Sequence, residues 1–180
     1  MPTKDMCQVN RATLTDGPVC GAKGFRIPPM KFTNKKVFGA RLRSRFPDYE
    51  EGWLYNYLES AFGCEPYTIS SRAKLDTLIT KTKRIAATLG GGYPLIAFPN
   101  GMAGWRGVPT NRRLSPVQIS SPDDLSELLR SHIYFRDPKR FEDNYHITDA
   151  SFSWIAIFCH HGDWHLYAPS ASISIAKGEE

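Results

Sequence analysis

The chain has 180 residues, of which 41% are hydrophobic and 23% are charged. That length suits one globular domain with a sizeable core, and the composition differs from that of disordered or fibrous proteins. No apolar run approaches the ~20 residues of a membrane-spanning helix, and the N-terminal segment lacks the apolar core of a secretory signal. We therefore expect a cytoplasmic protein with no membrane partner.

Charge is divided unevenly along the chain. Residues 1–90 carry fifteen Lys and Arg against eight Asp and Glu, a net charge of +7, whereas residues 91–180 have a net charge of −2. A basic half can bind an acidic protein or nucleic acid, or it can be a solvated face. No RNA-binding aromatic motif and no zinc-finger spacing accompanies the charge, so nucleic-acid binding is an alternative rather than the first hypothesis.

The cysteines follow no CxxC or other metal-ribbon spacing. Cys7 and Cys20 can pair in an oxidising compartment, but in the cytosol both are free thiols. The missing secretory signal favours free thiols, and the pairing stays open. We expect no bound metal and no cofactor. The four cysteines are Cys7, Cys20, Cys64 and Cys159.

Three helices are predicted in the N-terminal half, after an irregular arm over residues 1–32. Apolar residues recur there at three- and four-residue steps, which places them on one face of a helix. Thr33 or Asn34 is expected to cap the first helix and Asp48 the second, while the third begins at a Ser cap and ends at Gly90. The predicted helices cover 33–46, 49–63 and 70–90.

Short apolar runs bounded by Gly, Pro and Asn predict strands in the C-terminal half, together with one helix over 121–132 that Ser121 caps. From Trp154 onward both sides of one run are apolar, which indicates a central strand covered on both faces. Phe152 and Trp154 are expected to point the same way. The sequence HHGD then forms a hairpin loop. The predicted strands cover 93–98, 117–119, 145–149, 151–159 and 164–168.

These elements predict an α+β fold in a single domain over residues 33–180. The helical N-terminal half is expected to pack on a mostly antiparallel sheet formed by the C-terminal half. The polar tail from Ser170 is expected to end the fold without a site.

The loop over residues 99–116 is a candidate binding surface. It combines glycines with Trp105 and three arginines, and Trp and Arg are enriched at binding hot spots. The alternative is that Trp105 packs back onto the core. Two basic residues of the third helix complete the predicted surface, which consists of Trp105, Arg106, Arg112, Arg113, Lys81 and Arg84.

The segment WIAIFCHHGDWHLYA, residues 154–168, holds one cysteine and three histidines. A zinc site needs three or four ligands that converge on one point, whereas neighbours in a strand point to opposite faces. Cys159, His160 and His161 therefore converge only if the turn folds them together. The spacing matches no known ligand pattern, so we interpret the segment as a structural hairpin.

Catalysis by a cysteine requires a histidine base and a group that orients the base. Cys159 with His146 or His165 is the candidate pair here, oriented by Asp149 or Asp163. No cysteine-protease or GxSxG signature accompanies these residues, which favours a non-enzymatic protein. If the protein is an enzyme, the candidate catalytic residues are His146, Cys159, His160, His161 and His165.

The run YHITDASFSWIAIFCHHGDWHLYA resembles the C-terminal strand, histidine-containing turn and strand of small uncharacterised bacterial proteins and immunity-type proteins. The resemblance implies a bacterial cytosolic protein that binds a cognate toxin and blocks it without catalysis. Because this chain is basic, the implied toxin would have an acidic contact surface. The matching positions are Tyr145, Asp149, Phe152, Trp154, His160 and Trp164.

Three functional hypotheses follow, in this order. The first is a non-catalytic, toxin-neutralising protein that binds its partner through the Trp105 loop and the basic helices. The second is a hydrolase or nuclease with a His-rich C-terminal site. The third is a nucleic-acid-binding protein that uses the basic N-terminal half, for which affinity should fall steeply with salt.

Overall fold

The computed structural model describes residues 30–49, 52–70, 72–89, 92–137, 139 and 143–177. Cys7, Cys20 and nearly all of the predicted arm lie outside these residues, so the predictions for them stay untested.

The described ranges contain five helices and a seven-stranded, wholly antiparallel sheet with the strand order β1-β4-β3-β5-β6-β7-β2. The strands are β1 (Lys31–Phe32), β2 (Tyr67–Ile69), β3 (Leu95–Asn100), β4 (Val117–Ile119), β5 (Asn144–Thr148), β6 (Ile155–Phe158) and β7 (Trp164–Tyr167). The helices are α1 (Lys35–Arg45), α2 (Tyr55–Phe62), α3 (Leu75–Leu89), α4 (Pro122–His132) and α5 (Ser170–Lys177).

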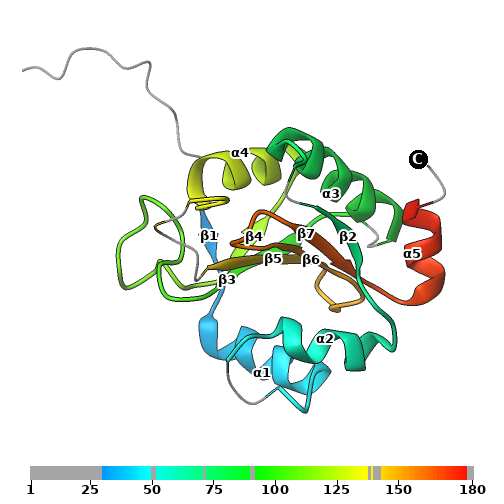
Figure 1. Ribbon diagram of the computed structural model, residues 1–180. Helices are drawn as coiled ribbons and strands as arrows, with labels where there is room; N and C mark the ends of the chain where they lie inside the picture. The colour runs from blue at the N-terminus through cyan, green and yellow to red at the C-terminus, as the bar shows by residue number, and fades with distance from the viewer. Residues whose placement is uncertain are drawn as a thin grey trace, which may run out of the picture.

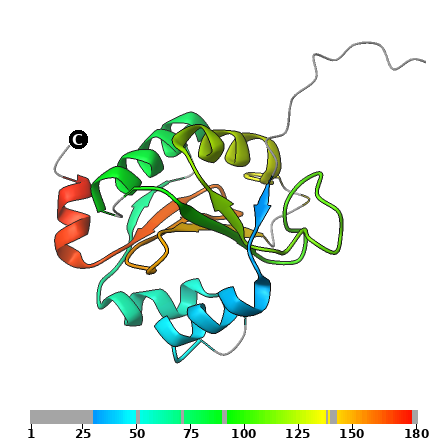
Figure 2. The ribbon, with the colours of Figure 1, turned by 180° about the vertical axis from the view of Figure 1, so that it is seen from behind.

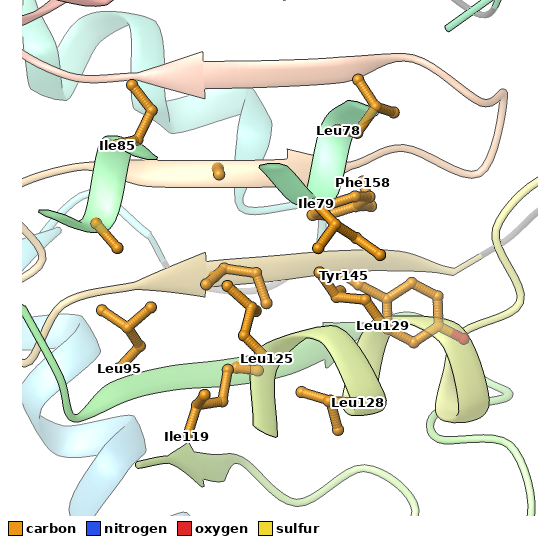
Figure 3. Close-up of a cluster of buried hydrophobic side chains, with 14 of the residues drawn as sticks. Leu78, Ile79, Ile85, Leu95, Ile119, Leu125, Leu128, Leu129, Tyr145 and Phe158 are labelled. Atoms are coloured by element: carbon orange, nitrogen blue, oxygen red, sulfur yellow. The ribbon is translucent and has the colours of Figure 1, made fainter. Parts of the chain in front are cut away.

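Helices cover both faces of the sheet, with α3 and α4 on one side and α1 and α2 on the other (Figures 1 and 2). Each face has its own hydrophobic cluster. Figure 3 shows the larger one, in which leucines and isoleucines of α3 and α4 lie over Tyr145 and Phe158 of the sheet. Every residue of β6 is buried, which confirms the predicted central strand. No helix among the described residues is long and apolar enough to cross a membrane.

The α+β fold is confirmed, but the division into a helical half and a sheet half is only partly right. The N-terminal half contributes the two edge strands β1 and β2, and the C-terminal half contributes α4 and α5. These edge strands have two and three residues, too few for an alternating pattern to stand out. β2 exists because it pairs with β7, where Thr68 lies opposite His165.

The helix starts follow local capping chemistry where a cap exists. Asn34 accepts hydrogen bonds from the first turn of α1, and Ser121 does so for α4, as predicted. Asp48 does not cap α2, which begins at Tyr55 without a side-chain cap. α3 begins at Leu75 rather than at a serine.

The segment before β6 departs from the predicted alternation. Phe152 has a φ of +55°, so the chain turns there and the strand begins only at Ile155. As a result Phe152 packs in the cluster under α1 and α2, whereas Trp154 packs in the cluster under α3 and α4. The expectation that the two side chains share a face is therefore wrong. The polar tail from Ser170 forms a further helix, α5, which is the last element of the described chain.

Candidate functional site

The turn between β6 and β7 is closed by two backbone hydrogen bonds. Cys159 N–H donates to Asp163 O at 2.8 Å and Gly162 N–H donates to Cys159 O at 2.9 Å. Gly162 has a φ of +93°, a conformation that L side chains rarely adopt. Arg136 lies against this glycine and donates to its carbonyl oxygen. The tight turn therefore holds its backbone in one shape and prevents the alternation of a regular strand.

The turn brings Cys159, His160 and His161 together. One potential ligand atom from each lies within 4.8 Å of the other two. Cys159 Sγ is 3.4 Å from His161 Nδ1 and 4.0 Å from His160 Nδ1, and the two imidazole centroids are 3.8 Å apart. A sulfur and a nitrogen bound tetrahedrally to one zinc ion lie about 3.5 Å apart, given bond lengths of roughly 2.3 and 2.0 Å. The 3.4 Å between Cys159 Sγ and His161 Nδ1 therefore suits a shared metal ion, while the His160 atom at 4.0 Å is the nitrogen that faces Asn144.

Asn144 fixes the orientation of the His160 ring. Its Oδ1 accepts the backbone N–H of His160 at 3.0 Å and lies 2.8 Å from His160 Nδ1. Because an atom that accepts a backbone N–H must be the amide oxygen, Nδ1 has to carry a hydrogen and donate it. The neutral ring then has its lone pair on Nε2. Metal-bound histidines usually donate their other ring nitrogen to an oxygen in this way.

The electrostatics of the turn do not favour a cysteine nucleophile. Burial raises the pKa of the Cys159 thiol, whereas a reactive cysteine needs a lowered one. Burial, and secondarily the neighbouring His161, lowers the pKa of His160. At neutral pH the turn thus holds a protonated thiol beside a neutral imidazole. Neutral imidazoles are the form that binds metals.

The other catalytic candidates lie elsewhere. His146 is fully buried and stacked on Phe98, with ring centroids 4.8 Å apart and an interplanar angle of 11°. His165 Nδ1 pairs with Thr68 Oγ1 at 2.9 Å. Asp149 accepts hydrogen bonds from two serines of its own turn. The structure therefore groups three of the five candidates, and His146 and His165 lie outside that group. Burial, and to a smaller extent the nearby His161, lowers the pKa of His165, while Asp163 opposes this shift.

Burial also sets the properties of His146. It lowers the pKa of His146 to about 3. Neither ring nitrogen makes a hydrogen bond of ordinary geometry with a described residue. His146 is thus a neutral core residue, remote from solvent.

Trp105 lies in the core, which is the alternative placement that the sequence left open. Its side chain is 1% exposed, and its Nε1–H donates to Ser115 O at 2.8 Å. The ring lies 5.4 Å from that of Tyr145, centroid to centroid. Arg106 and Arg112 remain exposed. Trp105 therefore anchors the loop and offers no surface for a partner.

The predicted binding residues fall into two places. Arg106, Arg112 and Arg113 belong to the loop between β3 and β4, while Lys81 and Arg84 belong to α3 and line a small hollow beside α5. Figures 1 and 2 show that loop at one end of the molecule and α5 at the other. A single partner would have to be large to contact both.

Two neighbours of the turn were not predicted from the sequence. Asn144 is buried at the start of β5, and Trp53, just before α2, has its ring 6.0 Å from that of His160. A polar residue at the start of an apolar strand is the one sequence feature that singles out Asn144. Nothing local to Trp53 indicates its contact with the turn.

Comparison with known proteins gives no relative for this chain. It matches no protein-family model, and searches of curated proteins and of solved structures give no match. The resemblance to immunity-type proteins therefore stays untested.

Proposed function

We propose that this protein binds a divalent transition-metal ion, with Zn²⁺ as the reference ion, through Cys159, His160 and His161. The carrying observation is that one ligand atom from each residue lies within 4.8 Å of the other two. The proposal departs from the expectation of no metal, because that expectation assumed that neighbours along the chain point apart.

The ligand set selects the kind of ion. One thiolate and two imidazoles suit Zn²⁺ and other borderline metals, whereas Mg²⁺ and Ca²⁺ require oxygen ligands. Asn144 holds the His160 ring through Nδ1, so His160 binds the ion either through Nε2, the atom with the lone pair, or through Nδ1 after giving up this hydrogen bond. Three protein ligands leave one tetrahedral position for water, a substrate or a group from a partner. His161 is exposed, so an ion can reach the turn from solvent.

Cobalt and zinc titrations of the full-length, tag-free chain test this proposal. Co²⁺ should produce an intense visible spectrum of tetrahedral type with a thiolate charge-transfer band, and Zn²⁺ should displace it at about one ion per chain. Cys159→Ser should abolish the charge-transfer band, and His161→Ala should weaken Zn²⁺ binding by roughly 100-fold.

Cys64 supplies the matched control. It is half-buried, and its Sγ pairs with the backbone oxygen of Ala168 on a different part of the chain. Cys64→Ser should leave the cobalt spectrum and the zinc affinity unchanged. A thiolate band that survives Cys159→Ser, or that disappears with Cys64→Ser, would contradict the assignment.

A second candidate function is the binding of a protein partner with an acidic surface, as expected for a bacterial cytoplasmic immunity-type protein. The observation that favours it is the loop between β3 and β4, which is anchored by Trp105 and exposes Met102, at 71%, as well as Arg106 and Arg112. Methionine and arginine on a preorganised loop are typical of binding surfaces.

Charge reversal tests this second candidate without disturbing the turn. Arg106, Arg112 and Arg113 are changed to Glu together, and proteins retained by the native chain and by the variant are compared quantitatively by mass spectrometry. A partner of the loop should be retained by the native chain and lost by the variant. A set of retained proteins that is the same for both would contradict a role for the loop.

A further inference from the structure

A cavity of about 420 Å³ lies between α4 and the edge of the sheet formed by β1 and β4. Asp124, Leu128 and His132 line it from one face of α4, at intervals of four residues. Val117 and Ile119 of β4 line it from the sheet. Figure 3 shows Ile119 and Leu128 at this end of the core. The volume falls within the roughly 300–1,000 Å³ of small-molecule sites.

His132 has one satisfied and one unsatisfied ring nitrogen. The residue is 4% exposed, and its Nδ1 lies 2.9 Å from the carbonyl oxygen of Arg106. Since a carbonyl oxygen can only accept, Nδ1 carries the hydrogen and the neutral ring has its lone pair on Nε2. Nε2 is buried and has no hydrogen-bond partner among the residues that the structure describes.

A buried acceptor without a partner is unfavourable in a folded protein. Here it belongs to a residue of the cavity wall, so the missing donor can come from a molecule inside the cavity. The charged residues that line the cavity, Lys31 and Asp124, have opposite signs. The site therefore favours an occupant without a net charge. The wall also contains the polar Gln118 and Ser120 beside its apolar residues, and His132 Nε2 is its buried acceptor without a partner among the described residues.

We propose that this cavity binds a small, uncharged, mainly apolar molecule that donates one hydroxyl hydrogen to His132 Nε2, as a phenol does. The site is separate from the metal-binding turn. β3 and β5 lie between β4 and the β6–β7 hairpin in the sheet. The two proposals can therefore fail independently.

p-Cresol and its methyl ether, 4-methylanisole, are the probes for this site. They share a ring and a methyl group, but the ether has no hydrogen to donate. In saturation-transfer NMR and titration of the full chain, p-cresol should bind with a Kd on the order of 1 mM. The ether should bind about tenfold more weakly, because it lacks one hydrogen bond.

His132→Asn separates the ligand contact from the structural one. An asparagine amide can still donate to the Arg106 carbonyl, but it has no atom at the position of Nε2. The variant should bind the two probes equally, at the weaker affinity of the ether. Leu128→Phe, which fills the cavity, should bind neither. His165→Asn is the matched control, because His165 pairs with Thr68 near the other edge of the sheet. This variant should leave both affinities unchanged.

Three results would overturn the proposal. The first is that the native chain binds neither probe at about 10 mM, which would mean that the cavity is filled by water or by the chain itself. The second is equal affinity of the native chain for p-cresol and its ether. The third is a preference for p-cresol that persists in His132→Asn while that variant retains the native unfolding transition.

Discussion

The loop between β3 and β4 and the turn between β6 and β7 look similar in sequence, yet they place their side chains in opposite ways. Each mixes glycine with aromatic and polar residues. In the loop, Trp105 enters the core and the arginines remain outside. In the turn, a cysteine and two histidines gather in partly or fully exposed positions, and Asn144 holds the ring of one of them, His160.

The difference comes from backbone hydrogen bonding. Trp105 N–H donates to Arg113 O at 2.8 Å, which folds the loop back on itself and directs the indole inward. In the turn, the bond from Cys159 N–H to Asp163 O leaves only a few residues to reverse the chain, so neighbouring side chains crowd together. A segment's composition thus indicates that it can bind, while its backbone decides which side chains are available to do so.

Trp105→Ala should produce the largest loss of stability and so test the structural role of the loop. Removing a buried tryptophan costs about 3–5 kcal/mol of unfolding free energy. Equilibrium urea unfolding of the native chain and the variant measures this loss of unfolding free energy. Trp53→Ala is the comparison, because Trp53 is half-exposed and should cost clearly less. A loss below about 1 kcal/mol for Trp105→Ala would show that its ring does not belong to the core.

The helices of the fold could largely be predicted from the sequence because their determinants are local. Asn34 and Ser121 cap their helices as the capping rules predict, and α3 has a periodic apolar face. The predicted start of α2 was wrong because the helix has no side-chain cap at its beginning. The buried Leu54 precedes its first residue, and we attribute the start to the packing of this side chain. β1 and β2 were missed because they exist through pairing with distant strands.

The candidate site was harder to predict, for a different physical reason. The sequence named Cys159, His160 and His161 as candidates, but strand alternation argued against their convergence. That argument fails in a turn, where Gly162 at positive φ reverses the chain. Asn144 comes from β5, and the tautomer it imposes on His160 depends on a long-range contact. The cavity beside His132 likewise depends on how α4 packs against β4.

Gly162→Ala should have the next largest effect and tests whether the turn depends on its backbone shape. A Cβ atom at this position would lie 2.8 Å from atoms of the Arg136 side chain, at a φ that disfavours alanine. The expected loss of unfolding free energy is about 1–3 kcal/mol. The zinc affinity of Gly162→Ala should also be lower than that of the native chain. Gly107→Ala is the control, since Gly107 also has a positive φ but no neighbour within 4 Å.

His146→Leu should change how stability depends on pH. With a folded-state pKa of about 3 against an ordinary 6.5, the unfolded chain gains a proton in this window that the folded chain does not. The unfolding free energy of the native chain should therefore fall as the pH falls from 6.5 towards 3, by about 1.4 kcal/mol per pH unit from this residue.

The leucine variant should lose that contribution to the slope. Urea unfolding at pH 7, 6 and 5 measures the unfolding free energies of both chains. The variant should become progressively more stable relative to the native chain as the pH falls. A difference that is independent of pH would mean that His146 can be protonated in the folded protein.

The smallest effect on stability should come from the turn in the absence of metal. His161 is exposed, so His161→Ala should change the unfolding free energy by less than about 0.5 kcal/mol in the presence of a chelator. Zinc at 100 times its Kd should stabilise the native chain by about 2.7 kcal/mol, because the ion binds the folded state. The variant should gain much less at the same zinc concentration. Equal zinc stabilisation of both chains would place the ion elsewhere, whereas a large loss with chelator alone would make His161 a structural residue of the hairpin. The pair of measurements therefore separates a turn that stabilises the fold, as the Trp105 loop does, from one whose side chains are free to bind.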